Sequence, residues 1–311
     1  MTNIMKDYVD LGKEILTEGE QTGDRTNVGT CSLFGERLKF NVSEVAPLLT
    51  ERKLPVRSVI GELLWFIEGS TNVDVLKNDY LCGFWDEWGS EKTRTIGPMY
   101  GKQWRDYNGV DQLAELLQQC IDHPTSRRLL VNTWIPDLIP DNNLPPAENP
   151  ENGKMSLAPC HFAYQLKIYP RMSAGYNVLD LMFVLRSSDY LLGLPANIAS
   201  YYFLMKLICG YLSRKTGNIY IPRNLVCMLG DVHIYSNHYS ACEELFDRSP
   251  STSEPVFIVT DEMVDIFESY IDGSFEKSEN KSELRKHNLR VIHKGVSNYF
   301  PGEPIKGARN V

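Results

Sequence analysis

The sequence predicts an α+β fold in a single domain that covers residues 1–311. Two segments alternate apolar and polar residues as half-buried strands do, with apolar side chains at positions 162, 164, 166 and 168 and at 179, 181, 183 and 185. Residues 56–68 are apolar nearly all round, which is typical of a buried helix, and residues 196–213 form a second long apolar helix. Because strands and helices do not alternate regularly, α+β is favoured over a doubly wound sheet.

The first half of the chain predicts further elements on both sides of the helix at 56–68. Ile4, Tyr8, Leu11 and Ile15 recur at helical spacing and predict an opening helix. Residues 28–41 are rich in Thr, Ser, Phe and Val and predict paired strands with a turn at Gly35-Glu36. Residues 111–122 predict a helix with Asp111 as its N-cap.

The rest of the chain continues the mixture of strands, helices and loops. Residues 127–134 predict a strand, and residues 136–156, rich in Pro, Asn, Asp and Glu, predict a long polar loop. Residues 225–235 predict another strand and residues 237–247 a short helix. Residues 248–296 are polar and acidic, with only weak strand and helix patterns and no clear linker.

Composition narrows the class of protein. The formal net charge is -8, which disfavours nucleic acid as a partner because sequence-independent DNA binding relies on basic patches. The seven Cys form no C-x-x-C pair, which disfavours a disulfide framework and a zinc ribbon and predicts a reducing, cytoplasmic setting with no metal. No apolar run approaches 18 residues, so no membrane association is expected.

Cys160 is the candidate nucleophile because of its surroundings in the sequence. It stands at the start of a predicted strand, directly after the long polar loop, where reactive groups reach ligands. Attack requires a thiolate, and neighbouring cations such as Arg127, Arg128 and Arg186 would lower a thiol pKa if the fold brought them close. From Cys160 alone, however, a small buried hydrophobe is the better interpretation.

Several motifs together resemble the thymidylate synthase family, in the order in which that family carries them. They are DRTNVGT (24–30), ELLWFIEGSTN (62–72), FWDEW (84–88), GPMYGKQWRD (97–106), SRR (126–128), LAPCH (157–161), RSSDYLLGLPANIASY (186–201) and GDVHIYSNH (230–238). The resemblance runs from about residue 5 to about 240 and resumes at the tail, PIKGARNV. It implies a large mixed sheet, flanked by helices, whose face forms the interface of a homodimer.

The resemblance also implies a covalent mechanism on dUMP with methylenetetrahydrofolate as cosubstrate. Cys160 would attack C6 of the pyrimidine, because covalent catalysis divides one difficult step into easier ones. Glu62 would be the general acid/base, and a Glu inside the apolar run GELLWF is costly to bury without a role. Tyr100 would assist proton removal at C5. Asn197 would read the pyrimidine edge, and an amide at this place indicates uracil, since the cytosine-specific relatives are expected to carry Asp.

The remaining site residues implied by the resemblance fall into two groups. The phosphate and sugar of dUMP would be held by Arg25, Arg127, Arg128, Arg186, Ser187, His233 and Tyr235, with Arg127 and Arg128 contributed across the dimer interface. Arg suits this task because it makes bidentate, charge-assisted bonds to phosphate. The reduced folate would be held by Trp85, Leu157, Asp189, Gly193, Ala196 and Arg309, with Asp189 also counted as catalytic. Without the resemblance, His233 and Trp85 would be interpreted as ordinary buried residues.

This chain departs from the family pattern at several positions, and two of these changes, Ala196 and Arg309, fall where the family packs its folate. Ala196 replaces the usual Phe, Leu185 replaces the usual Gln, and the tail carries Arg309 where apolar residues are usual. A polar lid could admit water. Three hypotheses therefore stand: thymidylate synthase, a dUMP hydroxymethylase that releases hydroxymethyl-dUMP and tetrahydrofolate, and an inactive homologue with a binding role. Trp85 and Leu157 favour methylation, and the intact set around Cys160 disfavours an inactive protein.

Overall fold

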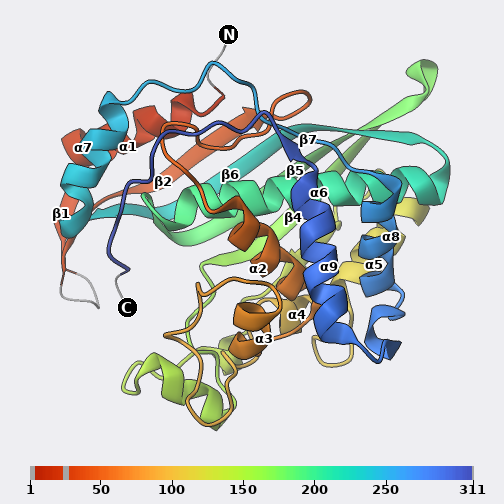
Figure 1. Ribbon diagram of the computed structural model, residues 1–311, viewed down its shortest axis with the longest axis horizontal. Helices are drawn as coiled ribbons and strands as arrows, with labels where there is room; N and C mark the ends of the chain where they lie inside the picture. Colours follow the sequence, from red (N-terminus) through yellow and green to blue (C-terminus); the bar gives the residue numbers. More distant parts are fainter. Residues whose placement is uncertain (1–3, 24–27, 310–311) are drawn as a thin grey trace.

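The computed structural model describes residues 4–23 and 28–309, and its largest sheet has six strands (Figure 1). Their spatial order is β1 (Glu20–Thr22), β2 (Thr30–Asn41), β6 (Ile219–Tyr235), β5 (Tyr176–Asp189), β4 (His161–Arg171) and β3 (Leu130–Asn132). β5 and β6 run parallel and every other neighbouring pair runs antiparallel. The predicted α+β class and large mixed sheet are thus confirmed.

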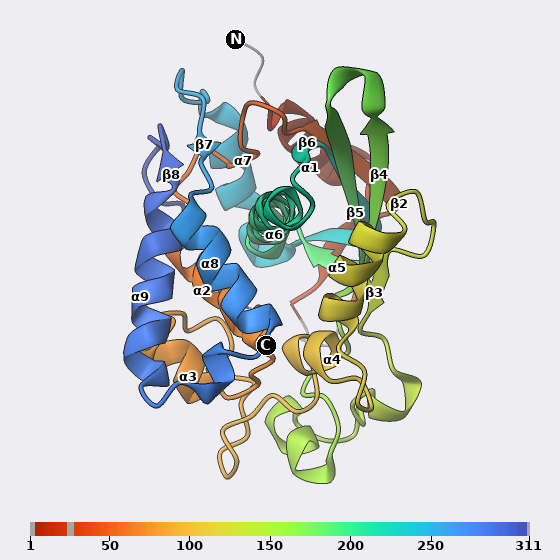
Figure 2. The same ribbon diagram turned by 90° about the vertical axis from the view of Figure 1, so that its right-hand side faces the viewer.

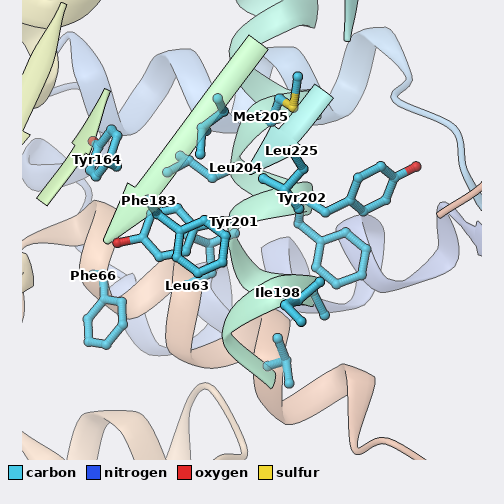
Figure 3. Close-up of a cluster of buried hydrophobic side chains, with 14 of the residues drawn as sticks. Leu63, Phe66, Tyr164, Phe183, Ile198, Tyr201, Tyr202, Leu204, Met205 and Leu225 are labelled. Carbon is cyan, nitrogen blue, oxygen red and sulfur yellow. The ribbon is translucent and has the colours of Figure 1, made fainter. Parts of the chain in front are cut away.

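A long central helix, α6 (Gly193–Thr216), organises the core. Figure 2 looks along α6 and shows it between the sheet and a layer that contains α2 (Val56–Glu68), α8 (Asp261–Ile271) and α9 (Lys281–Lys294). α6 is buried on nearly all sides because its residues from Leu194 to Leu212 are apolar with few interruptions. Figure 3 shows the contact with the sheet, where the ring of Tyr201 stacks on that of Phe183 with centroids 4.3 Å apart.

The other helices lie around this core. They are α1 (Lys6–Glu18), α3 (Val73–Asn78), α4 (Gly101–Arg105), α5 (Gln112–Asp122) and α7 (Tyr239–Asp247). The opening helix buries Tyr8, Leu11 and Ile15 as their spacing predicts. α5 begins where expected, since the Asp111 carboxylate accepts a hydrogen bond from the Ala114 amide.

Some predicted boundaries are wrong. Residues 30–41 form one continuous strand that pairs with β1 on one side and with β6 on the other. Its register with β6 passes Gly35 unchanged, so there is no turn at Gly35-Glu36. The strand expected at 127–134 is only Leu130–Asn132, because it lies at the edge of the sheet and pairs with β4 alone. The loop at 136–156 contains two 3-10 helices, Pro136–Leu138 and Pro146–Asn152.

The polar segment at 248–296 is more ordered than its sequence pattern indicates. It holds α8 and α9, together with a small two-stranded sheet of β7 (Val256–Phe257) and β8 (Val296–Ser297). α9 packs against α2 even though its average composition is strongly polar, because Asn288, Leu289 and Ile292 are buried on one side of it. The final segment then returns along the molecule toward β1 and α7 (Figure 1).

Candidate active site

A cavity of about 860 Å³ opens where the ends of β5 and β6 meet the N-terminus of α6. β5 and β6 are parallel, so their last residues reach the same edge of the sheet. Helix α2 and the C-terminal tail close other sides. The predicted residues that line this cavity are Glu62, Trp85, Tyr100, Leu157, Cys160, Arg186, Ser187, Asp189, Gly193, Ala196, Asn197, His233, Tyr235 and Arg309.

Two predicted phosphate ligands, among the residues that the structure describes, do not line this cavity. Arg127 and Arg128 are exposed beside the edge strand β3 and do not line the cavity of their own chain. Arg25 lies outside the described residues. Within one copy of the chain, the cavity therefore contains Arg186 and Ser187 from the predicted phosphate-binding set.

The turn that carries Cys160 is fixed by Arg186. The Arg186 guanidinium donates to the carbonyls of Pro159 (3.0 Å) and Ala158 (2.7 Å), and the Arg186 amide donates to the Cys160 carbonyl at 2.9 Å. The neighbouring strand can approach Arg186 closely because it carries Gly230 there, where an added Cβ would lie 2.7 Å from the Arg186 carbonyl oxygen. Cys160 itself is partly exposed, whereas the other six cysteines are buried.

Tyr100 is held against the same turn in a strained conformation. Its backbone has φ +28°, a region that residues with a Cβ rarely occupy and that costs on the order of 1–3 kcal/mol. Its hydroxyl accepts a hydrogen bond of 2.9 Å from the Cys160 amide, and its ring stacks on His161 with centroids 4.0 Å apart. Burial raises the pKa of the Tyr100 hydroxyl well above 10, so the residue is neutral in the resting site.

Glu62 is a buried carboxyl that contacts Trp85. The Trp85 indole donates to the Glu62 carboxylate at 2.6 Å, and Glu62 is 8% exposed. Burial raises the pKa of Glu62 from 4.5 to about 7, and the bond from Trp85 opposes part of this rise. A carboxyl that titrates near neutral pH can both give and take a proton, which is what general acid/base catalysis requires.

The sugar-side residues come from the end of β6. His233 Nδ1 lies 2.6 Å from the Asp231 carboxylate, which orients the ring, and the edge of His233 faces Tyr235 with centroids 5.0 Å apart. On the neighbouring strand β5, Asp189 is the register partner of His233 and accepts hydrogen bonds from the Leu191 and Leu192 amides. Burial raises the pKa of Asp189, while His238 and His233 nearby act in the opposite direction.

Comparison with known proteins identifies the family. The family model described as thymidylate synthase matches residues 6–277. The chain belongs to the thymidylate synthase family. It is similar to the thymidylate synthase of Francisella philomiragia subsp. philomiragia, with 40% identity over 248 residues that cover 79% of this chain and 85% of the relative. It is also similar to that of Francisella tularensis subsp. holarctica, with 37% identity over 275 residues that cover 88% and 95%.

The family methylates dUMP and uses methylenetetrahydrofolate as cosubstrate. The cavity suits a flat, polar ring beside the nucleotide, because Trp85, Trp88 and Leu192 give it apolar walls and Asp189 gives it a carboxylate. The Trp88 indole nitrogen is buried without a hydrogen-bond partner among the described residues. At about 860 Å³ the cavity is near the upper end of the usual range for small-molecule sites, roughly 300–1000 Å³, as two ligands require.

Other residues that line this cavity were not predicted from the sequence. They are Arg52, His161, Asp231 and Trp88, among others. Arg52 is 4% exposed, and its Nε has no hydrogen-bond partner among the described residues. Asp231 could have been found from its spacing, since residues two apart on a strand share a face and His233 is a predicted site residue. Arg52 gave no signal because it stands in the charged run Glu51-Arg52-Lys53.

The described part of the chain offers neither a metal cluster nor a membrane span. Among residues 4–23 and 28–309, no cluster of three or more His, Cys, Asp or Glu side chains could hold a metal ion. None of the described helices has the length and apolar character of a membrane span.

Proposed function

We propose that this chain converts dUMP to dTMP by reductive methylation, with Cys160 as the covalent nucleophile. The observation that carries the proposal is the convergence of Cys160, Tyr100, Glu62, Asn197 and His233 on one cavity. These side chains come from five separate segments of the sequence and supply a nucleophile, proton-transfer groups and polar groups for a base and a sugar. When bound, methylenetetrahydrofolate supplies the one-carbon group and the hydride.

Covalent attack would proceed from the thiolate of Cys160, a partly exposed residue that lines the cavity. The Cys160 sulfur bonds to C6 of the uracil ring, and the electron pair of the C5–C6 double bond moves to C5 and O4. Asn197 lines the cavity and pairs with O4 and N3-H of the ring. Its side-chain amide suits this assignment because it offers both a donor and an acceptor to the ligand.

Proton transfer falls to Glu62 and Tyr100. Glu62 takes and returns protons at O4 through ordered water, a role that its pKa of about 7 supports. The Tyr100 hydroxyl, held by the Cys160 amide, assists removal of the proton from C5. Trp85 and Leu157 exclude water from the transferred carbon, which favours a methyl product over hydroxymethyl.

Substrate binding divides between the two ends of the cavity. Arg186 and Ser187 bind the phosphate from within the chain, with Arg25 as a further ligand, and His233 and Tyr235 hold the sugar hydroxyl. The folate is contacted by Asp189, Gly193, Ala196 and Arg309.

We further propose a homodimer in which the sheet face opposite α6 is the interface. Residues 181, 183 and 185 of β5 and 225, 227 and 229 of β6 are buried, so the side chains between them point to the other face. Those side chains include Met182, Val184, Val226 and Met228, which are only partly buried, and an apolar surface of this kind favours a protein partner. The exposed pair at 127–128, beside β3, would complete the phosphate site of the second copy.

The test is a product assay. The protein is incubated with dUMP and methylenetetrahydrofolate, dihydrofolate is followed by absorbance, and the nucleotide is identified by mass. We expect dTMP and dihydrofolate in equal amounts. Hydroxymethyl-dUMP with tetrahydrofolate would contradict the methylating mechanism, and no nucleotide product would contradict catalysis. Two further statements stay predictions. The first is that residues 1–311 act as one catalytic domain, and the second is that the protein acts in the cytoplasm.

A further inference from the structure

His238 occupies an unusual position between the C-terminal tail and the cavity. It follows the end of β6 in the 3-10 helix Ser236–His238, and its side chain is fully buried. The edge of its ring meets Tyr235, one of the cavity residues, with centroids 5.7 Å apart. His238 does not itself line the cavity, so any part it plays acts through its neighbours.

One side of the His238 ring holds the tail. Its Nε2 donates to the Ala308 carbonyl at 2.7 Å. The tail backbone packs closely there, because a Cβ added at Gly307 would lie 3.1 Å from His238 Nε2 and 3.0 Å from Leu191 Cδ2. The next residue along the tail, Arg309, donates to the Gly83 carbonyl at 2.9 Å and lines the cavity.

The other side of the ring faces Asp189. His238 Nδ1 is buried, has no hydrogen-bond partner among the described residues, and lies 3.9 Å from the Asp189 carboxylate. That carboxylate is anchored by two amides just before α6 begins, and it lines the cavity. A single buried ring therefore stands between a tail carbonyl and a cavity carboxylate, and close packing transmits a displacement of one to the other.

We propose that His238 is a positioning residue that couples docking of the tail to the placement of Asp189. This role rests on the proposed function, which assigns this side of the cavity to the reduced folate. Loss of the Nε2 donor would remove the hydrogen bond that holds the Ala308 carbonyl, so the tail would open more often and the folate would bind less tightly.

Two substitutions distinguish the hydrogen bond made by Nε2 from the rest of the His238 ring, because one of them keeps a donor to Ala308 and the other removes it. In His238→Gln, the amide nitrogen reaches about the position of Nε2 and can still donate to Ala308. In His238→Asn, the shorter side chain cannot reach. His287→Asn is the matched control, because His287 is half exposed on α9 and contacts Glu262 instead of the tail.

The first measurement is the initial rate of trypsin cleavage after Arg309, followed by mass as loss of Asn310-Val311. This readout follows opening of the tail and needs no catalytic activity. We expect cleavage to rise roughly tenfold in His238→Asn, as loss of one hydrogen bond implies, and to stay within about twofold of wild type in His238→Gln and His287→Asn. Equal rates in His238→Asn and His238→Gln would overturn the proposal.

The second measurement is kinetic. His238→Asn should raise KM for methylenetetrahydrofolate roughly tenfold and leave KM for dUMP unchanged. Gly307→Val, whose side chain would push the tail away from His238 and Leu191 while leaving the His238 ring in place, should do the same and serves if His238→Asn does not fold. An unchanged folate KM in Gly307→Val, or an equal rise for both substrates, would overturn the coupling. A wild type that makes no dTMP would instead contradict the proposed function, and the cleavage rates would still test the tail contact.

Discussion

At the scale of single residues, the site depends on ionisable groups whose pKa values are shifted by burial. Burial lowers the pKa of His161 to about 3, and its Nδ1 lies 3.0 Å from the Tyr201 hydroxyl, so this ring stays uncharged beside Tyr100. Burial likewise raises the pKa of Glu62 to about 7. The folded chain thus binds a proton at Glu62 more tightly than the unfolded chain does, and this contribution to stability is complete below about pH 4.5 and is lost as pH rises through 7.

Glu62→Gln separates catalysis from stability. We expect kcat to fall by about 10²–10⁴, because the acid/base group is removed. The free energy of unfolding of wild type should fall relative to that of Glu62→Gln between about pH 5 and pH 8, by up to about 3 kcal/mol, because only wild type has to ionise a buried carboxyl. Denaturant unfolding at both pH values measures the second effect. A constant difference across this range would show that Glu62 does not titrate near neutral pH.

The sequence predicts the role of a residue where the residue stands in a recognisable motif. It does not predict a role that depends on contacts between distant parts of the chain. Cys160, Asn197 and His233 are predicted from the motifs alone, and all three line the cavity. The bonds from Arg186 to the turn before Cys160 could not be predicted, because they join a strand end to a loop 27 residues earlier. Arg52 was missed for the same reason: its burial is a property of the packed chain.

At the scale of elements, α9 is attached to α2 by a buried polar cluster. Arg285 binds both Glu68, at the end of α2, and Asp79, and the Tyr80 hydroxyl donates to Glu68 at 2.6 Å. The side chains of Arg285 and Glu68 are 13% and 5% exposed, so neither charge is well solvated. Because α2 also carries Glu62, this cluster supports the helix on which the proposed acid/base group stands.

Arg285→Met should lower the free energy of unfolding by about 3 kcal/mol, since removing one member of a buried ion pair leaves the other without compensation. Lys286→Met is the control. Lys286 is the next residue along the same helix, but its side chain is 38% exposed and pairs with the exposed Glu283 one helical turn away, so its loss should change stability by less than about 0.5 kcal/mol. Chemical denaturation compares the two variants, and equal effects would mean that the Arg285 cluster is no more stabilising than a surface pair.

The elements themselves were predicted unevenly. α2 begins and ends where the apolar run predicts, because burial on nearly all sides leaves an unmistakable pattern. α9 was not predicted, since most of its residues are polar or charged and its attachment depends on Arg285, Glu68 and Asp79 meeting in space. β1 was also missed, because three exposed residues at a sheet edge carry no apolar alternation.

At the scale of the whole molecule, the proposed dimer would explain why Arg127 and Arg128 lie outside the cavity of their own chain. If they complete the site of the second copy, each active site draws residues from both chains. Two variants test this arrangement. One is the double variant Arg127→Ala with Arg128→Ala, and the other is Cys160→Ala. In a shared site, the residues changed in the first variant and the residue changed in the second come from different chains.

Mixing these two variants tests the shared site. Each alone should have little activity. After dissociation and random reassociation we expect about a quarter of wild-type activity, because about half of the dimers are mixed and each mixed dimer has one intact site. Wild type taken through the same treatment is the control. If mixing restores no activity, the two arginines either act in the active site of their own chain or belong to no active site, and the shared site is contradicted.

Trapping the covalent adduct shows whether Cys160 attacks C6 of the pyrimidine. Fluorine at C5 of the substrate prevents loss of a proton there, so 5-fluoro-dUMP with methylenetetrahydrofolate should leave nucleotide and cofactor bound to the protein. Mass spectrometry of the denatured protein and its peptides should find both on Cys160, and on no peptide of the Cys160→Ala variant. An adduct on another residue, or dTMP formation by Cys160→Ala, would contradict the mechanism.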